Sequence, residues 1–329
     1  MFRSLTERRG GALICALPAW VCLLGAAPAA AAGIAPLAVV EAAAGVFVHL
    51  GRHEETTSAN RGDIANIGFI VGERCVAVVD SGGSLAVGLA LKAAVRAKTN
   101  RPVCYVINTH MHPDHVFGNA AFVDAADASD PSEPVRFVGS ARLPDALATR
   151  DAHYRAALRA ALGEGAAGSR VVPPDLLVEG ELHLDLGGRV LILRTWPTAH
   201  TNNDLTVFDA ATGTLWLGDL LFERRIPSLD GSIKGWLAVI GQLRELPARQ
   251  VIPGHGALGL AWPAALDATA RYLEQVAGQV KAALDRGLAL HETVNAANLA
   301  AETEAAGWLL AESYHRRNVT AAYAELEWE

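Results

Sequence analysis

The chain has 329 residues, of which 51% are hydrophobic and 19% are charged, and its formal net charge is −7. A chain of this length can bury a large core and form one or two domains. The aliphatic-rich, aromatic-poor composition is typical of a globular protein and favours an α/β fold. The acidic balance, without a long basic run, argues against nucleic acid as a partner.

The beginning of the chain has the pattern of an export signal. Three arginines precede an apolar stretch at residues 12–27, and small side chains suitable for cleavage follow at 27–32. The adjacent Arg8 and Arg9 leave the Sec and twin-arginine routes both open. A retained membrane anchor is the alternative, although the stretch is short for a span. We expect a signal peptide at 1–32, a periplasmic or secreted mature protein, and no membrane span after the signal.

The first half of the mature chain alternates strands and helices. Apolar runs predict strands at 45–50, 67–72, 75–79 and 103–107. Helical spacing predicts a helix at 84–98, which makes the strands on either side of it parallel neighbours in a βαβ unit. Further along, we expect a short helix opening at 118–120, an exposed loop at 124–134, a helix at 143–162 and a connection at 163–174. We expect the helix at 143–162 and the connection at 163–174 to lie over the active site.

Three histidines and a carboxylate lie within six residues directly after the strand at 103–107, in Thr109-His110-Met111-His112-Pro113-Asp114-His115. Pro113 argues against a helix through this cluster, so we expect a loop at the carboxyl end of a strand, where α/β sheets usually place chemistry. Neutral imidazole is the commonest metal-ligating side chain, and zinc accepts histidine nitrogen and aspartate oxygen. A loop of ordinary solvated histidines is the alternative, and it does not account for this grouping.

The second half returns to strands and ends in helices. Strands are predicted at 178–186 and 189–195, joined as a hairpin at Gly187-Gly188, and at 204–208, 214–217 and 250–252. Two helices follow, from about Pro263 to Gly287 and from about 307 to 324.

The cluster after the strand at 103–107 resembles the H-x-H-x-D-H signature of the metallo-β-lactamase superfamily. The resemblance implies a four-layer αβ/βα sandwich at residues 33–262, with a helical C-terminal extension at 263–329 packed on the same domain. It also implies that Asp80 holds the metal-binding loop through hydrogen bonds. A residue in the first turn of the following helix is the other reading of Asp80, and the two are compatible.

The same resemblance supplies the remaining ligands, each at a strand end: His200, Asp219 and His255. It implies two zinc ions per chain, one held by His110, His112 and His200 and the other by Asp114, His115 and His255, with Asp219 bridging them. A hydroxide between the two ions would attack a carbonyl, ester or thioester bond of a small-molecule substrate. Asp114 is the candidate catalytic residue, because it can orient the water and accept its proton.

Three functional readings remain open. The loop at Asp230-Gly231-Ser232 and the C-terminal segment 316–329 resemble the quinoprotein relay system zinc metallohydrolases, which implies an association with periplasmic quinoprotein dehydrogenases. A bridging carboxylate at Asp219 also suits iron, as in sulfur or persulfide oxygenases of the superfamily. The third reading is a non-catalytic quinoprotein partner. For substrate binding, Arg224 or Arg225 is a candidate for holding an anionic group, with a surface salt bridge as the alternative.

Only two cysteines, Cys75 and Cys104, follow the export signal. They occupy equivalent positions on the two strands predicted to be parallel neighbours, because each lies five residues before a strand-end residue, Asp80 and Thr109. Neighbouring strands lie about 4.8 Å apart, which allows a disulfide, and an oxidising compartment favours one. Two buried thiols are the alternative.

Overall fold

The computed structural model describes Met1 and residues 34–123, 134–297 and 307–328. The predicted signal at 1–32 and almost all of the predicted loop at 124–134 lie outside the described residues. Residues 34–329 make up one compact unit, which is the part considered below. Within the described part of this unit, no helix is long and apolar enough to cross a membrane.

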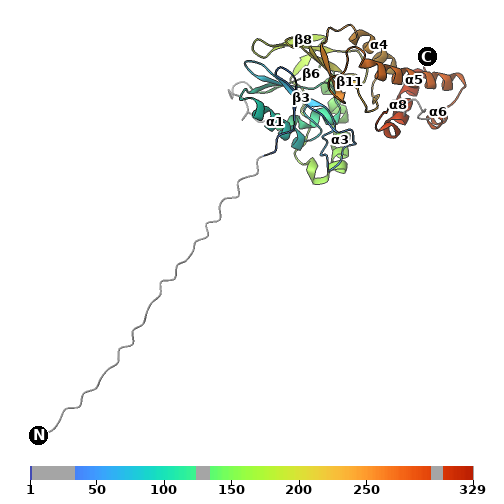
Figure 1. The fold of residues 1–329 in the computed structure, drawn as a ribbon. Coiled ribbons are helices and arrows are strands. Elements are labelled where there is room, and N and C mark those ends of the chain that lie inside the picture. The colour runs from blue at the N-terminus through green and yellow to red at the C-terminus, as the bar shows by residue number, and fades with distance from the viewer. Residues whose placement is uncertain (2–33, 124–133, 298–306, 329) are drawn as a thin grey trace. The chain divides into compact units, whose positions relative to one another are not determined.

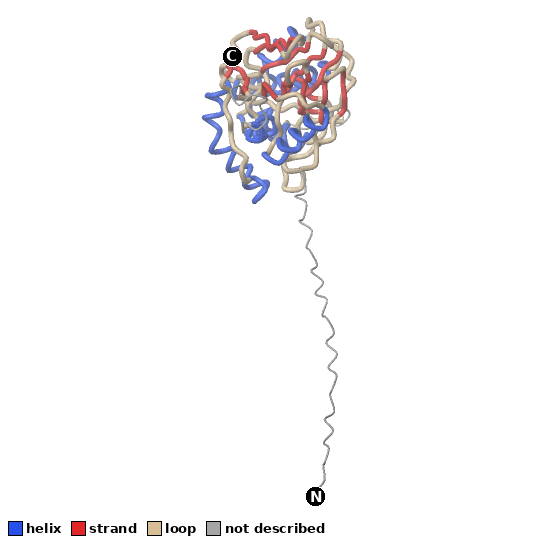
Figure 2. Tube along the Cα trace, turned by 90° about the vertical axis from the view of Figure 1, so that its left-hand side faces the viewer, coloured by secondary structure: helices blue, strands red, loops and turns tan. Residues whose placement is uncertain are grey.

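Two β-sheets form the centre of this unit (Figures 1 and 2). Within the described residues, the first sheet has seven strands in chain order: β1 (Val40–Ala43), β2 (Val46–His49), β3 (Ile67–Val71), β4 (Val76–Val79), β5 (Val103–Ile107), β6 (Arg136–Ser140) and β7 (Leu176–Val178). The second, over the same residues, has five strands in the order β12 (Gln250–His255), β11 (Thr214–Phe222), β10 (Leu205–Asp209), β9 (Val190–Thr195) and β8 (Glu181–Asp185).

In chain order the described helices are α1 (Leu85–Lys98), α2 (Pro113–Val116), η1 (Phe117–Phe122), α3 (Leu143–Leu162), η3 (Gly163–Ala166), α4 (Ile233–Leu243), α5 (Leu266–Asp285), α6 (Leu290–Ala296) and α8 (Ala311–Leu326). The helices α1, α4, α5 and α8 pack on the outer faces of the two sheets, and α3 packs on the segment that follows the histidine loop. Figure 1 shows α1 and α3 on one side of the unit and α4, α5, α6 and α8 on the other.

Three clusters of buried apolar side chains define four layers. Between the sheets, Val79 and Ile107 of the first sheet pack with Leu193 and Trp216 of the second. On the outer face of the first sheet, α1 contributes Leu91 to a second cluster. A third cluster joins the outer face of the second sheet to α4, α5 and α8. The predicted αβ/βα sandwich with its C-terminal helices is therefore confirmed.

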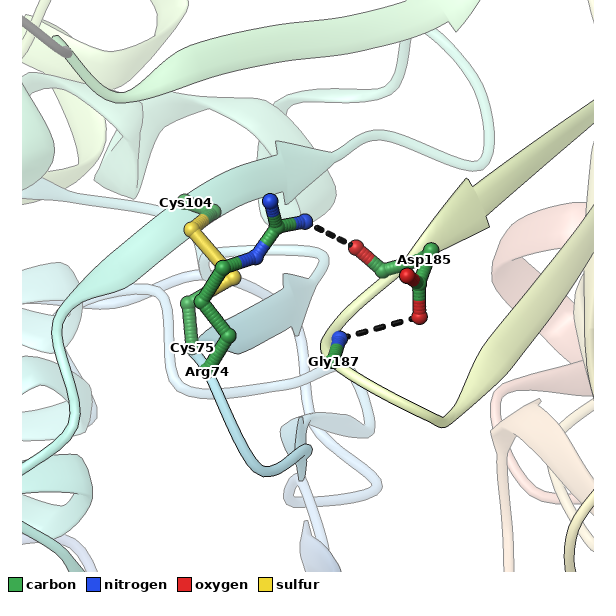
Figure 3. Close-up of a disulfide and its surroundings, with 5 residues drawn as sticks. All are labelled: Arg74, Cys75, Cys104, Asp185 and Gly187. Atoms are coloured by element: carbon green, nitrogen blue, oxygen red, sulfur yellow. Dashed lines mark hydrogen bonds between the residues drawn. A yellow bond between two sulfur atoms is a disulfide. The ribbon is translucent and has the colours of Figure 1, made fainter.

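The βαβ unit around α1 forms as predicted. Ser84 caps the helix by accepting a hydrogen bond from the backbone N–H of Val87. The flanking strands β4 and β5 pair in parallel. A disulfide joins Cys75 and Cys104 across them, with Cα atoms 5.8 Å apart (Figure 3). The structure therefore contains the disulfide and not the alternative of two buried thiols.

The strand predicted at 178–186 is wrong, because the structure divides it between the sheets. β7 pairs with β6 in the first sheet, and β8 pairs with β9 in the second. Gly180 lies between them with a φ of 73°, a left-handed conformation that breaks a strand and favours glycine. The crossover from one sheet to the other therefore takes place at this residue.

Two smaller expectations also need correction. Pro113 does not exclude a helix after the histidines, because it occupies the first turn of α2, where its missing N–H has no helical partner to lose. The strand that carries Asp219 does not end there but continues to Phe222, with register shifts around Gly218. The strands β1 and β6 and the helices α4 and α6 had no predicted counterpart.

Candidate metal centre

The structure brings all the predicted ligands together in two groups of donor atoms. The first group contains His110, His112, His200 and Asp219, and the second contains Asp114, His115 and His255. Within each group the donor atoms lie within 4.8 Å of one another. They come from the end of β5 and α2, the loop after β9, the middle of β11 and the end of β12.

Asp219 lies between the two groups. Its Oδ2 is 3.8 Å from His110 Nε2 and 3.5 Å from His200 Nε2 in the first group. In the second group, its Oδ1 is 3.2 Å from His115 Nε2, and its Oδ2 is 3.4 Å from His255 Nε2. One carboxylate therefore faces donors of both groups, as the bridging role requires.

Each histidine turns one ring nitrogen toward the cluster and anchors the other. Four of them point Nε2 toward the cluster and hold Nδ1 against a neighbouring oxygen. The Nδ1 of His110 contacts Thr109 Oγ1, and that of His115 contacts Asp80 Oδ2. The Nδ1 of His200 contacts the Ser228 carbonyl, and that of His255 contacts the Ile64 carbonyl. His112 is reversed: its Nδ1 lies 3.0 Å from the Nε2 atoms of both His110 and His200, and its Nε2 lies 3.2 Å from Asp230 Oδ2. Such partners fix the tautomer and the orientation of a ligating ring.

Asp80 lies where the resemblance placed it. Its carboxylate accepts hydrogen bonds from the N–H and the hydroxyl of Thr109, both at 2.8 Å, and contacts His115 Nδ1 at 2.8 Å. Its φ of 54° is in the left-handed region, which is uncommon for a residue other than glycine. This conformation turns the side chain back under the loop that carries the histidines.

The charges of the site suit a cation. Burial and the nearby His115 lower the pKa of His110 well below its usual value, and burial and His112 lower the pKa of His200 to about 3. Both rings are therefore neutral, which is the form that binds metal. Burial also disfavours a charge on His115, but Asp219, Asp80 and Asp114 outweigh it and raise the pKa of His115 well above 6.5. Three carboxylates thus attract positive charge to the point where the two groups meet.

Unpartnered buried atoms support the fit of the donor set to metal ions. His115 Nε2 and Asp219 Oδ1 are buried, yet neither makes a hydrogen bond. The backbone also leaves room for the carboxylate, because a methyl group at Gly254 would overlap Asp219 Oδ1. A buried cluster of imidazole nitrogens and carboxylate oxygens with free lone pairs suits the coordination of Zn²⁺ or iron.

The cluster opens to solvent on one side. Among the donor side chains of the two groups, His112 is 17% exposed and Asp114 is 14% exposed, whereas His115 is fully buried. Asp230, which contacts His112, is 40% exposed and faces Arg150 of α3 at 3.5 Å. A substrate would therefore approach past Asp114 and His112, beneath α3.

The two arginines proposed for substrate binding have different surroundings. Arg225 is buried, donates to the Glu54 carbonyl and to the Tyr314 hydroxyl, and lies over the Tyr314 ring. Arg224 is exposed and has a φ of 61°. A surface salt bridge does not describe Arg225, and its role toward a substrate stays a prediction.

The residues whose contacts with the Nδ1 atoms orient the histidine rings were not identified from the sequence. Thr109, Ile64 and Ser228 act through a hydroxyl or a backbone carbonyl, for which side-chain patterns give little signal. Asp230 was noted for the resemblance of its loop to the quinoprotein relay proteins, and its contact with His112 was not foreseen.

The comparisons with known proteins agree with this geometry. The sequence model of the metallo-beta-lactamase superfamily matches residues 60–255, more than half of the chain. The chain therefore belongs to the metallo-β-lactamase superfamily, and that prediction is confirmed. No curated protein sequence matches the chain.

Several solved structures share the fold. The stereoselective inverting sec-alkylsulfatase Pisa1 from Pseudomonas sp. is 15% identical, with a TM-score of 0.67 over 88% of this chain and 50% of the sulfatase. A metallo-β-lactamase from Pontibacter korlensis is 19% identical, with a TM-score of 0.56 over 72% of this chain and 99% of the lactamase. TMB-1 is 21% identical, with a TM-score of 0.53 and coverage of 74% and 99%. This chain thus spans about half the length of the sulfatase. The resemblance to the quinoprotein relay proteins stays a prediction.

Proposed function

We propose that the protein is a periplasmic or secreted hydrolase that uses two zinc ions to cleave carbonyl, ester or thioester bonds. The observation that carries the proposal is the position of Asp219 between two groups of donors that are otherwise complete. Two zinc ions, when bound, lower the pKa of a shared water and polarise the bond under attack. An open side at Asp114 and His112 gives a substrate access to this point.

Asp114 is the residue of this chain that we assign to proton transfer. Its Oδ2 lies 3.4 Å from His255 Nε2, at the open side of the cluster. Burial favours its neutral form, but His115 and His255 lower the pKa of Asp114 below its usual value. The carboxylate is therefore ionised at neutral pH, so it can orient a water molecule and accept its proton.

Two observations support an exported protein that holds zinc. The signal-like residues 1–32 predict export, and the bond between Cys75 and Cys104 suits an oxidising compartment. An exported site weighs against ferrous iron, although a bridging carboxylate such as Asp219 also suits it. The association with quinoprotein dehydrogenases rests on the resemblance of the loop at 230–232 and of the C-terminal segment.

Metal analysis combined with activity assays tests the proposal. The protein purified without chelators should contain close to two zinc ions per chain and hydrolyse at least one member of a panel of thioesters, lactones, β-lactams and a secondary alkyl sulfate. The sulfate ester is included because of the fold shared with the alkylsulfatase. Iron with oxygen uptake on a persulfide would favour the oxygenase reading instead. Bound zinc without turnover, together with binding to a quinoprotein dehydrogenase, would favour the non-catalytic partner.

A further inference from the structure

The loop at residues 226–232, between β11 and α4, contacts two histidines of the first donor group. The Ser228 carbonyl accepts a hydrogen bond from His200 Nδ1, and Asp230 Oδ2 lies 3.2 Å from His112 Nε2. Both contacts are made to the ring nitrogen that faces away from the other donors. The position of this loop therefore decides how the two rings are presented to a metal ion.

One side of the loop is held by the chain segment that carries His200 itself. The backbone N–H of Asp230 donates to the carbonyl of His200 at 3.0 Å, and the N–H of Ser232 donates to the carbonyl of Ala199 at 2.9 Å. These bonds tie the loop to the ligand segment but do not tie either of them to the rest of the fold. Elsewhere the loop contacts Arg150 of α3 through Asp230 at 3.5 Å and the Leu309 carbonyl through the Ile226 N–H at 3.0 Å, but neither contact holds Ser228. The support for Ser228 comes from the opposite side.

The C-terminal helix α8 provides this support. Asn318, which is 1% exposed, accepts a hydrogen bond from the Leu229 N–H at 2.9 Å through Oδ1 and donates to the Pro227 carbonyl at 2.7 Å through Nδ2. Its amide therefore holds the chain on both sides of Ser228. The same Nδ2 also donates to the hydroxyl of Tyr272 in α5 at 2.8 Å, which fixes the amide to the neighbouring helix.

The end of the loop is held by the same helix. Glu325 accepts hydrogen bonds from the Ser232 hydroxyl and from the Ile233 N–H, both at 2.7 Å. Asn318 and Glu325 lie two helical turns apart on α8, which packs against α5 and α6 (Figure 1). A rigid element thus contacts both the middle and the end of the loop.

We propose that α8 positions the first group of metal ligands, with Asn318 as the main positioning residue, acting through Ser228 on His200. The inference rests on the proposed function, because that function gives His112 and His200 their role as ligands. It assigns to the C-terminal helix a function at the site, in addition to its part in the core. Loss of the Asn318 amide should weaken metal binding without removing any ligand.

The test compares the full-length protein with three variants, each of which alters side-chain hydrogen bonds of α8. Asn318→Leu keeps the size of the side chain and removes the contacts with the loop. Tyr323→Phe is the matched control, because the Tyr323 hydroxyl donates to the Leu288 carbonyl, away from the loop. Glu325→Gln is a milder second variant at the end of the loop, in case Asn318→Leu does not fold. Cobalt(II) affinity is measured by competition with a chelator, and the absorption spectrum of bound cobalt reports the ligand geometry.

We expect Asn318→Leu to weaken one of the two cobalt sites about tenfold to a hundredfold and to alter the spectrum of bound cobalt, as changes in residues that orient ligands do. Glu325→Gln should shift the affinity in the same direction by less, and Tyr323→Phe should leave affinity and spectrum unchanged. Wild-type affinity in both Asn318→Leu and Glu325→Gln would overturn this inference but not the proposed function. An equal loss of affinity in Tyr323→Phe would do the same. A wild-type protein that binds no cobalt would overturn the proposed function as well.

Discussion

His115 Nε2 and Asp219 Oδ1 lie 3.2 Å apart in the interior of the protein, and neither atom completes a hydrogen bond. Unsatisfied polar atoms of this kind are costly when buried, so a folded protein retains them where another partner satisfies them. Both atoms belong to residues that face the junction of the two donor groups. A bound metal ion would therefore relieve the cost of leaving these two buried atoms unsatisfied.

The first prediction concerns metal removal. Adding Zn²⁺ to chelator-treated protein should raise its melting temperature, because binding to the folded state alone contributes about 2.7 kcal/mol when the free metal is at about 100 times its dissociation constant. Calorimetry with and without zinc measures the shift. Mg²⁺ is the control, since it prefers oxygen ligands alone and should give no shift. Equal stabilisation by both ions would contradict a histidine-rich site.

The second prediction concerns the proposed base. Asp114→Asn should keep the fold and lower turnover about a hundredfold or more, which is the usual contribution of general-base catalysis. The measurement is kcat on the best substrate of the panel, with metal content determined on the same sample. Asp151→Asn changes a more exposed carboxylate on α3 and should retain full activity. Near-normal turnover of Asp114→Asn with both metals bound would remove this residue from the mechanism.

The third prediction concerns the space around Asp219. Gly254→Ala should reduce the zinc content and destabilise the protein by about 1–3 kcal/mol, because the added methyl group overlaps Asp219 Oδ1 and nearby backbone. Gly278→Ala is the control, since nothing lies within 4 Å of a Cβ at this position in α5. There, alanine should stabilise the helix by about 0.5–1 kcal/mol. A Gly254→Ala protein that binds zinc normally would show that Asp219 can move freely.

The fourth prediction concerns the disulfide. Thiol titration of the denatured, unreduced protein lacking residues 1–32 should find no free thiol. Cys75→Ala should leave one free thiol and lower the free energy of unfolding by about 3–4 kcal/mol, the loop-closure estimate for a separation of 29 residues. Denaturant titration measures the loss. Two free thiols in the unreduced wild-type protein would show that the bond does not form.

The fifth prediction concerns pH. Burial disfavours the charged form of His49, but its contacts with Asp63 at 2.6 Å and with the Ala38 carbonyl outweigh this and raise the pKa of His49 above 6.5. A raised pKa in the folded state stabilises the protein fully below pH 6.5, and the effect is lost as the pH rises through the folded-state pKa. In metal-free protein, the loss of unfolding free energy caused by His49→Gln should therefore be larger at pH 6 than at pH 8. A loss that is larger at pH 8 would reverse the assigned direction.

Much of the site was predictable because its ligands follow short apolar strands in a recognisable order. His110, His112, Asp114 and His115 lie within a few residues of one another, and the later ligands each accompany a strand of the second sheet. The alternation of strands and helices indicated an α/β fold, and the resemblance to the superfamily implied its four layers. The pairing of Cys75 with Cys104 required only that two strands joined by one helix be parallel neighbours.

The rest depended on contacts that no local pattern records. The Asn318 side chain and the Leu229 N–H are 89 residues apart in sequence, and Asn318 looks like any polar residue of a C-terminal helix. The division of the segment at 178–186 between two sheets depended on the conformation of Gly180, not on a change in hydrophobic pattern. Such features arise from tertiary packing, which overrides local propensity.

The position of α8 in the chain has a consequence for biosynthesis. Every predicted metal ligand, from His110 to His255, is made before the helix that supports the loop at 226–232. All the donors are therefore present in a growing chain while the carbonyl that orients His200 still lacks its anchor. Metal acquisition should follow completion of α8, and a chain that stops after α5 should hold metal poorly.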